Sequence, residues 1–424
     1  MQLPHTFRAL RHRDYRIFLQ GQAVSLVGTW LQSVAQAWLV YRLTGSALHL
    51  GFVTFCSQIP VFLLSPLGGA VADRTNRLRL LVGTQAASMA LAFTLGTLTL
   101  TGAVTVTHVY VLATLLGIAN SFDIPARQSF VPSLVPRPDL SNAIALNSSI
   151  FNAARIVGPA LAGVMIAAVG EGWCFVLNGA SFLAVIGVLL RIRTQDRPRA
   201  TGRSPLADIV EGVRFAAHNG PVRSLLALTA ATSLLTLPYT TLMPLMADRV
   251  LGAGSRGLGL LMASTGLGAL TGAMLLASRR TEGGLGRWVA TGVSGLGVGL
   301  IAFSASRMLV LSAVLLAGVG LATLVQMASS NTLLQTLTPG HLRGRVMALY
   351  SMMFLGMAPF GGLAFGAVAT HAGVAWTIAG GGVLAVLTSL IFLRELPRLR
   401  VQTREMLAER EAERALDPAE NGSP

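Results

Sequence analysis

Long apolar runs separated by short polar gaps recur along the whole chain, and they constrain its fold more than any other feature. A window of about 19 residues identifies twelve such runs. They lie in segments 17–41, 47–70, 79–101, 106–125, 142–168, 173–192, 223–246, 257–277, 286–305, 308–329, 345–369 and 374–393. An α-helix of about 20 residues spans the hydrocarbon core of a bilayer and satisfies its backbone hydrogen bonds internally. The runs therefore predict an all-α membrane protein with twelve transmembrane helices.

Composition separates the chain from soluble proteins and limits its partners. Hydrophobic residues make up 53% of it and charged residues 12%, whereas soluble domains carry about 25% charged residues. All 32 basic residues are arginines, and the formal net charge is +15. These arginines stand in the gaps between apolar runs rather than on one face of a helix. They therefore favour the lipid bilayer over nucleic acid as a partner.

Residues suited to catalysis or metal binding do not cluster in the sequence. The seven histidines are scattered, and no Ser/His/Asp set, metal-ligand spacing or phosphate-binding loop occurs. Cys56 and Cys174 lie far apart in or beside apolar runs, which predicts packed thiols. We therefore expect that the protein is not an enzyme and that it has neither a metal site nor a cofactor. Because no ATP-binding motif occurs, any driving energy must come from a gradient or a separate subunit.

The arginines also predict how the chain sits in the membrane. They crowd the lead before the first run, the gaps after the second and fourth runs, and the long middle loop. The alternate gaps hold only Arg42, Arg249, Arg256 and Arg307. Positive residues stay on the cytoplasmic side, and an even number of spans places both ends together. We expect a multi-pass protein of a bacterial inner membrane with both termini in the cytoplasm.

The chain divides near its midpoint into two related halves. A shift of 203 positions lays segment 134–163 on segment 337–366 with eight identical residues, and the fifth run then matches the eleventh. This is expected of two six-helix bundles related by an axis along the membrane normal. We expect bundles at 1–193 and 222–394, a cytoplasmic linker at 194–221 and a partly disordered cytoplasmic tail at 395–424. The linker contains an amphipathic pattern, which predicts a helix at the membrane surface or a packed connector.

A dense charge cluster follows the second apolar run, in the stretch GGAVADRTNRLRLL at 68–81. Its glycines let another helix approach closely, while its acid can face a helix N-terminus and its arginines can reach carboxylates or phosphates. Gly69, Asp73, Arg74 and Arg77 match the signature between helices two and three of the major facilitator superfamily, which this chain resembles. From the glycine spacing and the acid we expect the cluster to lock one conformation. The alternative is a set of charges that only orient the chain.

The resemblance also implies a partner on the fourth helix for the signature arginine. Asp123, in the segment ANSFDIPARQ, takes that place. We interpret Asp123 first as a structural residue, and a role in proton coupling is the alternative.

The fifth run carries NAARIVGPALAG at 152–163, which is similar to the antiporter signature of the superfamily. Pro159 cannot donate a backbone hydrogen bond and so frees the carbonyl of Arg155, and Gly158 permits a kink. Exporters carry this signature more often than importers do. Arg155 lies about 20 Å along its helix, a depth at which a charge faces a cavity or a partner. Two kinds of partner for Arg155 stay open. One is structural, namely the freed carbonyls together with Asn152, and the other is an anionic or polyphenolic substrate.

Polar stripes on several runs predict a central cavity. The first run places Gln22, Ser25, Thr29, Gln32 and Gln36 on one helical face, and the seventh and tenth runs carry comparable stripes. Because the superfamily lines its cavity with helices one, four, seven and ten, the stripes favour a shared path over contacts that merely join helices. We expect substrate-binding residues at Gln32, Gln36, Asn120, Asn152, Arg155, Tyr239 and Gln326. We expect gating residues at Gly69, Asp73, Arg74, Arg77, Asp123, Gly158 and Pro159.

The segments 38–47 and 122–163 make the chain similar to a branch of the superfamily that includes enterobactin exporters and macrolide efflux proteins. The resemblance implies a secondary active transporter that works by alternating access, but not its substrate, because the branch is broad. We expect the transporter to be a monomer. It would export a small amphipathic molecule, drug-like or siderophore-like, in exchange for protons. An importer or lipid-moving transporter on the same scaffold, and a non-transporting receptor or scaffold, are the alternatives.

Overall fold

The computed structural model describes residues 5–192, 205–278, 284–339 and 342–416, and this part of the chain is helical without strands. Twelve of its helical segments are long and apolar enough to cross a membrane. The predicted all-α fold with twelve transmembrane helices is therefore confirmed, and the chain is a multi-pass membrane protein.

The N-terminal half contains six long helices after a short 3-10 segment at His5–Arg11. They are α1 (Arg13–Thr44), α2 (Ala47–Arg74), α3 (Arg77–Leu100), α4 (Val106–Phe130), α5 (Leu140–Val169) and α6 (Glu171–Leu189). Local residues determine where they end. Gly45 ends α1 with φ of 60°, a conformation that residues with a side chain avoid. The Asn76 side chain caps α3 by accepting a hydrogen bond from the backbone N–H of Arg79.

The C-terminal half repeats this plan with two interrupted spans. The seventh span contains α8 (Gly220–Leu235), the 3-10 turn η4 (Leu237–Leu242), α9 (Met243–Leu245) and the π turn η5 (Met246–Val250). Pro238 and Pro244 lack the backbone donor that a continuous helix needs, so the span is interrupted there. The eleventh span is divided into α13 (Arg343–Gly356) and α14 (Ala358–Ala372). The remaining spans are α10 (Gly254–Ala277), α11 (Leu285–Ala305), α12 (Leu309–Leu337) and α15 (Val374–Leu416).

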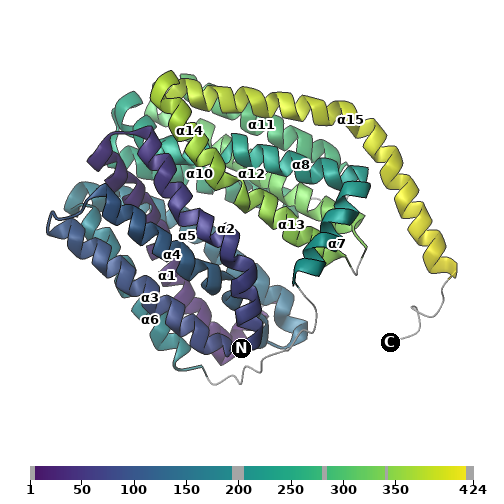
Figure 1. The fold of residues 1–424 in the computed structure, drawn as a ribbon, viewed down its shortest axis with the longest axis horizontal. Helices are drawn as coiled ribbons and strands as arrows, with labels where there is room; N and C mark the ends of the chain where they lie inside the picture. Colours follow the sequence, from purple (N-terminus) through teal and green to yellow (C-terminus); the bar gives the residue numbers. More distant parts are fainter. Residues whose placement is uncertain (1–4, 193–204, 279–283, 340–341, 417–424) are drawn as a thin grey trace.

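The two halves share a hydrophobic core at one end of the molecule only. There, Leu39 and Leu50 of the first half belong to one buried cluster with Leu242 and Leu300 of the second. At the other end each half has a buried cluster of its own. Figure 1 shows the halves converging at the upper left and separating toward the end at which the chain begins. We call that latter end the terminal side and the shared end the far side.

The linker and the tail both extend from the terminal side. Helix α7 (Pro205–His218) contacts α13 through an ion pair of 2.8 Å between Glu211 Oε1 and Arg345 Nη1. Its Ala216 is buried, while Val210 and Val213 are exposed. It is therefore packed on one face, and its place at a membrane surface stays a prediction. The expected linker residues 194–204 lie outside the described residues, as do tail residues 417–424, whereas α15 continues through Leu416.

Candidate functional site

A cavity of about 640 Å³ lies between the two halves. The six helices of the N-terminal half supply most of its wall, and η4, α9 and α10 supply the rest through Thr240, Thr241, Pro244, Leu258 and Met262. Its volume is in the range of sites for drug-sized ligands, about 300–1,000 Å³. The cavity is therefore large enough for a small molecule, and its chemistry comes mainly from the first half.

Carboxamide side chains dominate the polar part of the wall. Six are glutamines, namely Gln22, Gln32, Gln36, Gln58, Gln85 and Gln128. Three are asparagines, namely Asn120, Asn147 and Asn178. The apolar part includes the aromatic rings of Trp30, Phe151 and Phe182. A ligand can therefore make hydrogen bonds on one side and aromatic contacts on another.

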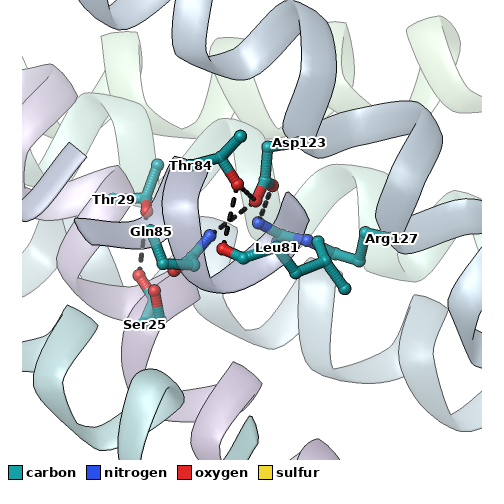
Figure 2. A network of polar contacts seen from close by, with 7 residues as sticks. All are labelled: Ser25, Thr29, Leu81, Thr84, Gln85, Asp123 and Arg127. Carbon is teal, nitrogen blue, oxygen red and sulfur yellow. Dashed lines mark hydrogen bonds and ion pairs between the residues drawn. The ribbon is translucent and has the colours of Figure 1, made fainter. Parts of the chain in front are cut away.

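Asp123 on α4 is the centre of a polar network in the cavity wall (Figure 2). Its Oδ1 accepts hydrogen bonds from Thr84 Oγ1 at 2.9 Å and Gln85 Nε2 at 2.8 Å, both on α3. Its Oδ2 pairs with the guanidinium of Arg127, one turn further along α4. With the Gln22 amide turned so that its oxygen faces α4, that oxygen accepts from Arg127 Nε at 3.1 Å and Nη1 at 2.7 Å. The network thus joins α1, α3 and α4.

The environment of Asp123 explains why its charge can be buried. Its side chain is 2% exposed, while that of Arg127 is 25% exposed. An isolated carboxylate at such a place would be costly, and the guanidinium with two hydrogen-bond donors offsets that cost. The second half lacks this charge, because the shift of 203 positions that relates α4 to α12 puts Gln326 at the place of Asp123. Gln326 Nε2 donates to Ser330 Oγ at 3.3 Å instead.

The superfamily resemblance implies that Asp123 pairs with a signature arginine. The structure shows a different partner. In the described part of the chain Asp123 pairs with Arg127 of its own helix, since positions four residues apart share a helix face. Asp73 Oδ1 instead pairs with Arg77 Nη2 at 3.5 Å at the terminal end of α2. Arg74 is exposed there. The Asp123 and Asp73 pairs are therefore two separate units.

The close helix approach beside the signature occurs at Gly68 rather than at Gly69. The carbonyl oxygen of Ser121 on α4 lies where a Cβ of residue 68 would stand. A Cβ on Gly69 would have Pro125 Cβ as its nearest neighbour, at 4.0 Å. Only the first glycine is therefore needed for α2 to contact α4 backbone to backbone.

Three of the seven predicted substrate-binding residues line the cavity, namely Gln32, Gln36 and Asn120. Asn178 Nδ2 donates to Gln32 Oε1 at 2.7 Å and holds that amide against α6. The other four do not line this cavity. Asn152 donates to the Ser148 carbonyl on its own helix, and Tyr239 and Gln326 are buried elsewhere in the C-terminal half.

Arg155, the fourth, lies beside Trp30, which lines the cavity. Its Cζ atom is 6.0 Å from the centroid of the Trp30 ring, at the limit of the distance for a cation–π contact of about 6 Å. The Arg155 carbonyl oxygen that Pro159 frees faces α10, 3.0 Å from the place of a Gly266 Cβ. The structure thus adds an aromatic partner to the two kinds that the sequence leaves open.

Gly158 and Pro159 are placed differently from each other. A Cβ on Gly158 would lie 3.0 Å from the Val27 carbonyl and would overlap Trp30 Cβ, so this glycine packs α5 against α1 within one half. The Pro159 carbonyl faces α10 of the other half, 2.7 Å from the place of a Gly259 Cβ. One turn of α5 therefore contacts both halves.

Contacts on the far side close the cavity there. Tyr41 Oη donates to Asp248 Oδ2 at 2.6 Å, and Arg249 Nη2 donates to the Gly45 carbonyl at 2.8 Å. The Arg249 guanidinium also lies over the Tyr41 ring, 5.7 Å from its centroid. We call these four residues the far-side latch. Two of its members, Asp248 and Arg249, lie on the π turn η5, a geometry that often marks functional positions.

Sequence reasoning did not assign the far-side latch. The available signal was Arg249 itself, one of the few arginines in the gaps that otherwise lack them. The partners could not be predicted, because Tyr41 and Asp248 are 207 positions apart in the chain. For Asp123 and Arg127 the signal was local, since the acid and the base are four residues apart.

We expect Arg249→Ala to loosen the far-side latch. The change removes a donor from the Gly45 carbonyl and a cation from Tyr41, and for an exposed contact this is worth about 0.5–1 kcal/mol, a two- to fivefold change in population. A membrane-impermeant maleimide should then label Ser255→Cys two- to fivefold faster, in a background without Cys56 and Cys174. Arg256→Ala, an exposed arginine on the same side, serves as the control. An unchanged labelling rate in Arg249→Ala would contradict the assignment.

Two six-helix halves that enclose a polar cavity and meet through contacts on one side define a membrane transporter. The comparison with protein families is specific: a family model described as transmembrane secretion effector matches residues 5–420. The chain belongs to this family of the major facilitator superfamily. The resemblance indicated by the motifs is thereby confirmed, and the protein is a transporter rather than an enzyme.

Curated relatives cover nearly the whole chain. The staphyloferrin A transporter of Staphylococcus aureus is 25% identical over 92% of this chain and 98% of its own length. The multidrug efflux pump Tap of Mycolicibacterium fortuitum is 28% identical over 88% of this chain and 93% of its own length. The enterobactin exporter EntS of Escherichia coli is 26% identical over 94% of this chain and 96% of its own length. Among solved structures, a peptide transporter POT in complex with sulfate matches 92% of this chain and 95% of its own with a TM-score of 0.74. The sequence identity is 12%, so this match shows a shared fold.

Proposed function

We propose that this protein exports small amphipathic molecules, drug-like or siderophore-like, in exchange for protons by alternating access. The single observation that carries the proposal is the cavity between the halves, which holds one buried acid and is closed by the far-side latch. The relatives named as an efflux pump and an exporter support export as the direction. Both halves of one chain form the cavity, so a monomer suffices.

The arginine distribution supports an inward-facing conformation. The terminal side carries most of the arginines, and we assign it to the cytoplasm of a bacterial inner membrane. The halves share a core and three hydrogen bonds on the far side, the third from Ser255 Oγ to the Gly163 carbonyl at 3.4 Å. Export then requires these contacts to open while the terminal side closes.

Asp123 is the group that we assign to the coupling proton. In the described chain it is the acid that lines the cavity, and Arg127 is the base that faces it. Protonation of the carboxylate would release Arg127 from its ion pair and leave Oδ1 with two hydrogen-bond donors. The contacts that join α1, α3 and α4 would then change. Proton binding could thereby shift the equilibrium between the two conformations.

An accumulation screen tests the function directly. Antibiotics and siderophores are offered to an efflux-deleted host that expresses the protein, with and without a protonophore. We expect lower accumulation of at least one compound, reversed by the protonophore. Uptake by inside-out vesicles separates export from import. A receptor or scaffold would show no change in accumulation and would be unaffected by Gln36→Ala, a change in the cavity wall.

We expect Asp73→Asn to weaken the lock at the end of α2. The carboxylate loses its charge and Arg77 loses its ion pair at 3.5 Å, a contact whose acid is 41% exposed. The expected effect is therefore small, roughly two- to fivefold in transport and in the ratio of inward to outward accessibility by cysteine labelling. Asp73→Glu keeps the charge and is the control. Full transport with unaltered accessibility in Asp73→Asn would argue that the cluster only orients the chain.

A further inference from the structure

The charges in the cavity wall cancel each other. In the described chain Asp123 and Arg127 are the charged residues that line the cavity, and they are paired with each other. Arg127 is further held by the Gln22 oxygen, and Asp123 by Thr84 and Gln85. A ligand therefore meets no side chain that offers it an unused charge.

Several carboxamides in the wall have unused hydrogen-bonding capacity. Gln32 and Asn178 bond to each other, and Gln22 and Gln85 bond to the ion pair. In the described chain, five other amides that line the cavity make no side-chain hydrogen bond, namely Gln36, Gln58, Asn120, Gln128 and Asn147. Each amide presents two N–H donors and a carbonyl acceptor. These groups are available to a ligand that carries matching donors and acceptors.

An aromatic corner lies in the same cavity. The rings of Trp30 and Phe151 meet edge to face with centroids 5.9 Å apart, and Phe182 lines the wall as well. The Arg155 guanidinium covers the Trp30 ring at 6.0 Å and helps to hold it in place. A flat apolar group can pack here while hydrogen-bonding groups reach the amides.

From this wall we infer that the transported substrate is uncharged, with a flat aromatic part and several hydroxyl or amide groups. The inference rests on the proposed transport function and names the substrate class of the same cavity. A charged ligand gives up water without gaining a counter-charge, whereas a neutral polar ligand exchanges water for amide hydrogen bonds. The cavity thus discriminates by charge as well as by size.

Three fluorescent probes with one ring system test this inference. They are 4-methylumbelliferyl glucoside, which is neutral, its glucuronide, which is anionic, and a methylcoumarin with a quaternary ammonium group. We expect proteoliposomes with an imposed pH gradient to transport the glucoside at least roughly tenfold faster than either charged probe. Equal or faster transport of a charged probe overturns the inference but leaves the transport function standing. If the glucoside is not transported, the inference also falls, and the accumulation screen decides the function separately.

Variants of one partly buried amide in the cavity wall sharpen the test. Gln36 lines the cavity, and its side chain makes no hydrogen bond in the described chain. Gln36→Glu should reduce glucoside transport and raise transport of the quaternary ammonium probe, and Gln36→Arg should raise that of the glucuronide. Gln335→Glu, on the exposed face of α12 outside the cavity, is the matched control and should retain the original preference. An unchanged charge preference in both Gln36 variants would overturn the inference.

Discussion

Replacement of Asp123 by asparagine is expected to reduce gradient-driven transport to near background. The variant keeps the size of the side chain but removes its charge, and the 2% exposed position offers no water in compensation. Arg127 then loses its ion pair, a change that costs about 3–5 kcal/mol for a fully buried pair and less here because Arg127 is 25% exposed. A loss of at least about tenfold in transport therefore follows.

The measurement must separate coupling from damage to the fold. Proteoliposomes report accumulation driven by a pH gradient and, in a second assay, exchange of substrate without a gradient. If Asp123 binds the coupling proton, Asp123→Asn keeps exchange and loses accumulation. Loss of activity in both assays indicates a structural role. Normal accumulation would show that Asp123 does not bind the coupling proton. Asp14→Asn, an acid on the first turn of α1 beside Arg13, controls for the loss of a negative charge outside the cavity.

Replacement of Gly163 by leucine is expected to abolish transport by preventing closure of the far side. A Cβ at this position on α5 would lie 2.8 Å from the Ser255 carbonyl and 2.9 Å from Gly259 Cα, both on α10 of the other half. These are backbone atoms, so the helices must separate to admit the side chain. A transporter that cannot close on one side cannot alternate, and transport should fall by about a hundredfold or more.

Cysteine accessibility distinguishes this mechanism from misfolding. In Gly163→Leu the impermeant maleimide should label Ser255→Cys faster, because the far side stays open. The control is Gly318→Leu on α12, where a Cβ would meet nothing within 4 Å. It should transport normally. Normal transport by Gly163→Leu would show that the halves do not close at this crossing.

The helices and several contacts were accessible from sequence, because their causes are local. Hydrophobic length identified the twelve spans. The polar stripe of the first run placed Gln32 and Gln36 on the face that lines the cavity. The structure pairs Asp123 with Arg127 of its own helix rather than with a signature arginine, although the four-residue spacing of the two was a local signal for this pair.

The sequence by itself determined a twelve-helix membrane protein, since the length of an apolar run and the spacing of its polar residues act within single helices. The tertiary structure alone decided that Gly68 rather than Gly69 contacts α4, and that Tyr41 meets Asp248. It also decided that Arg155 lies beside Trp30 and is not among the residues that line the cavity. These contacts join positions far apart in the chain. Their partners depend on the rotation and depth at which each helix packs, and helical periodicity carries no information about either.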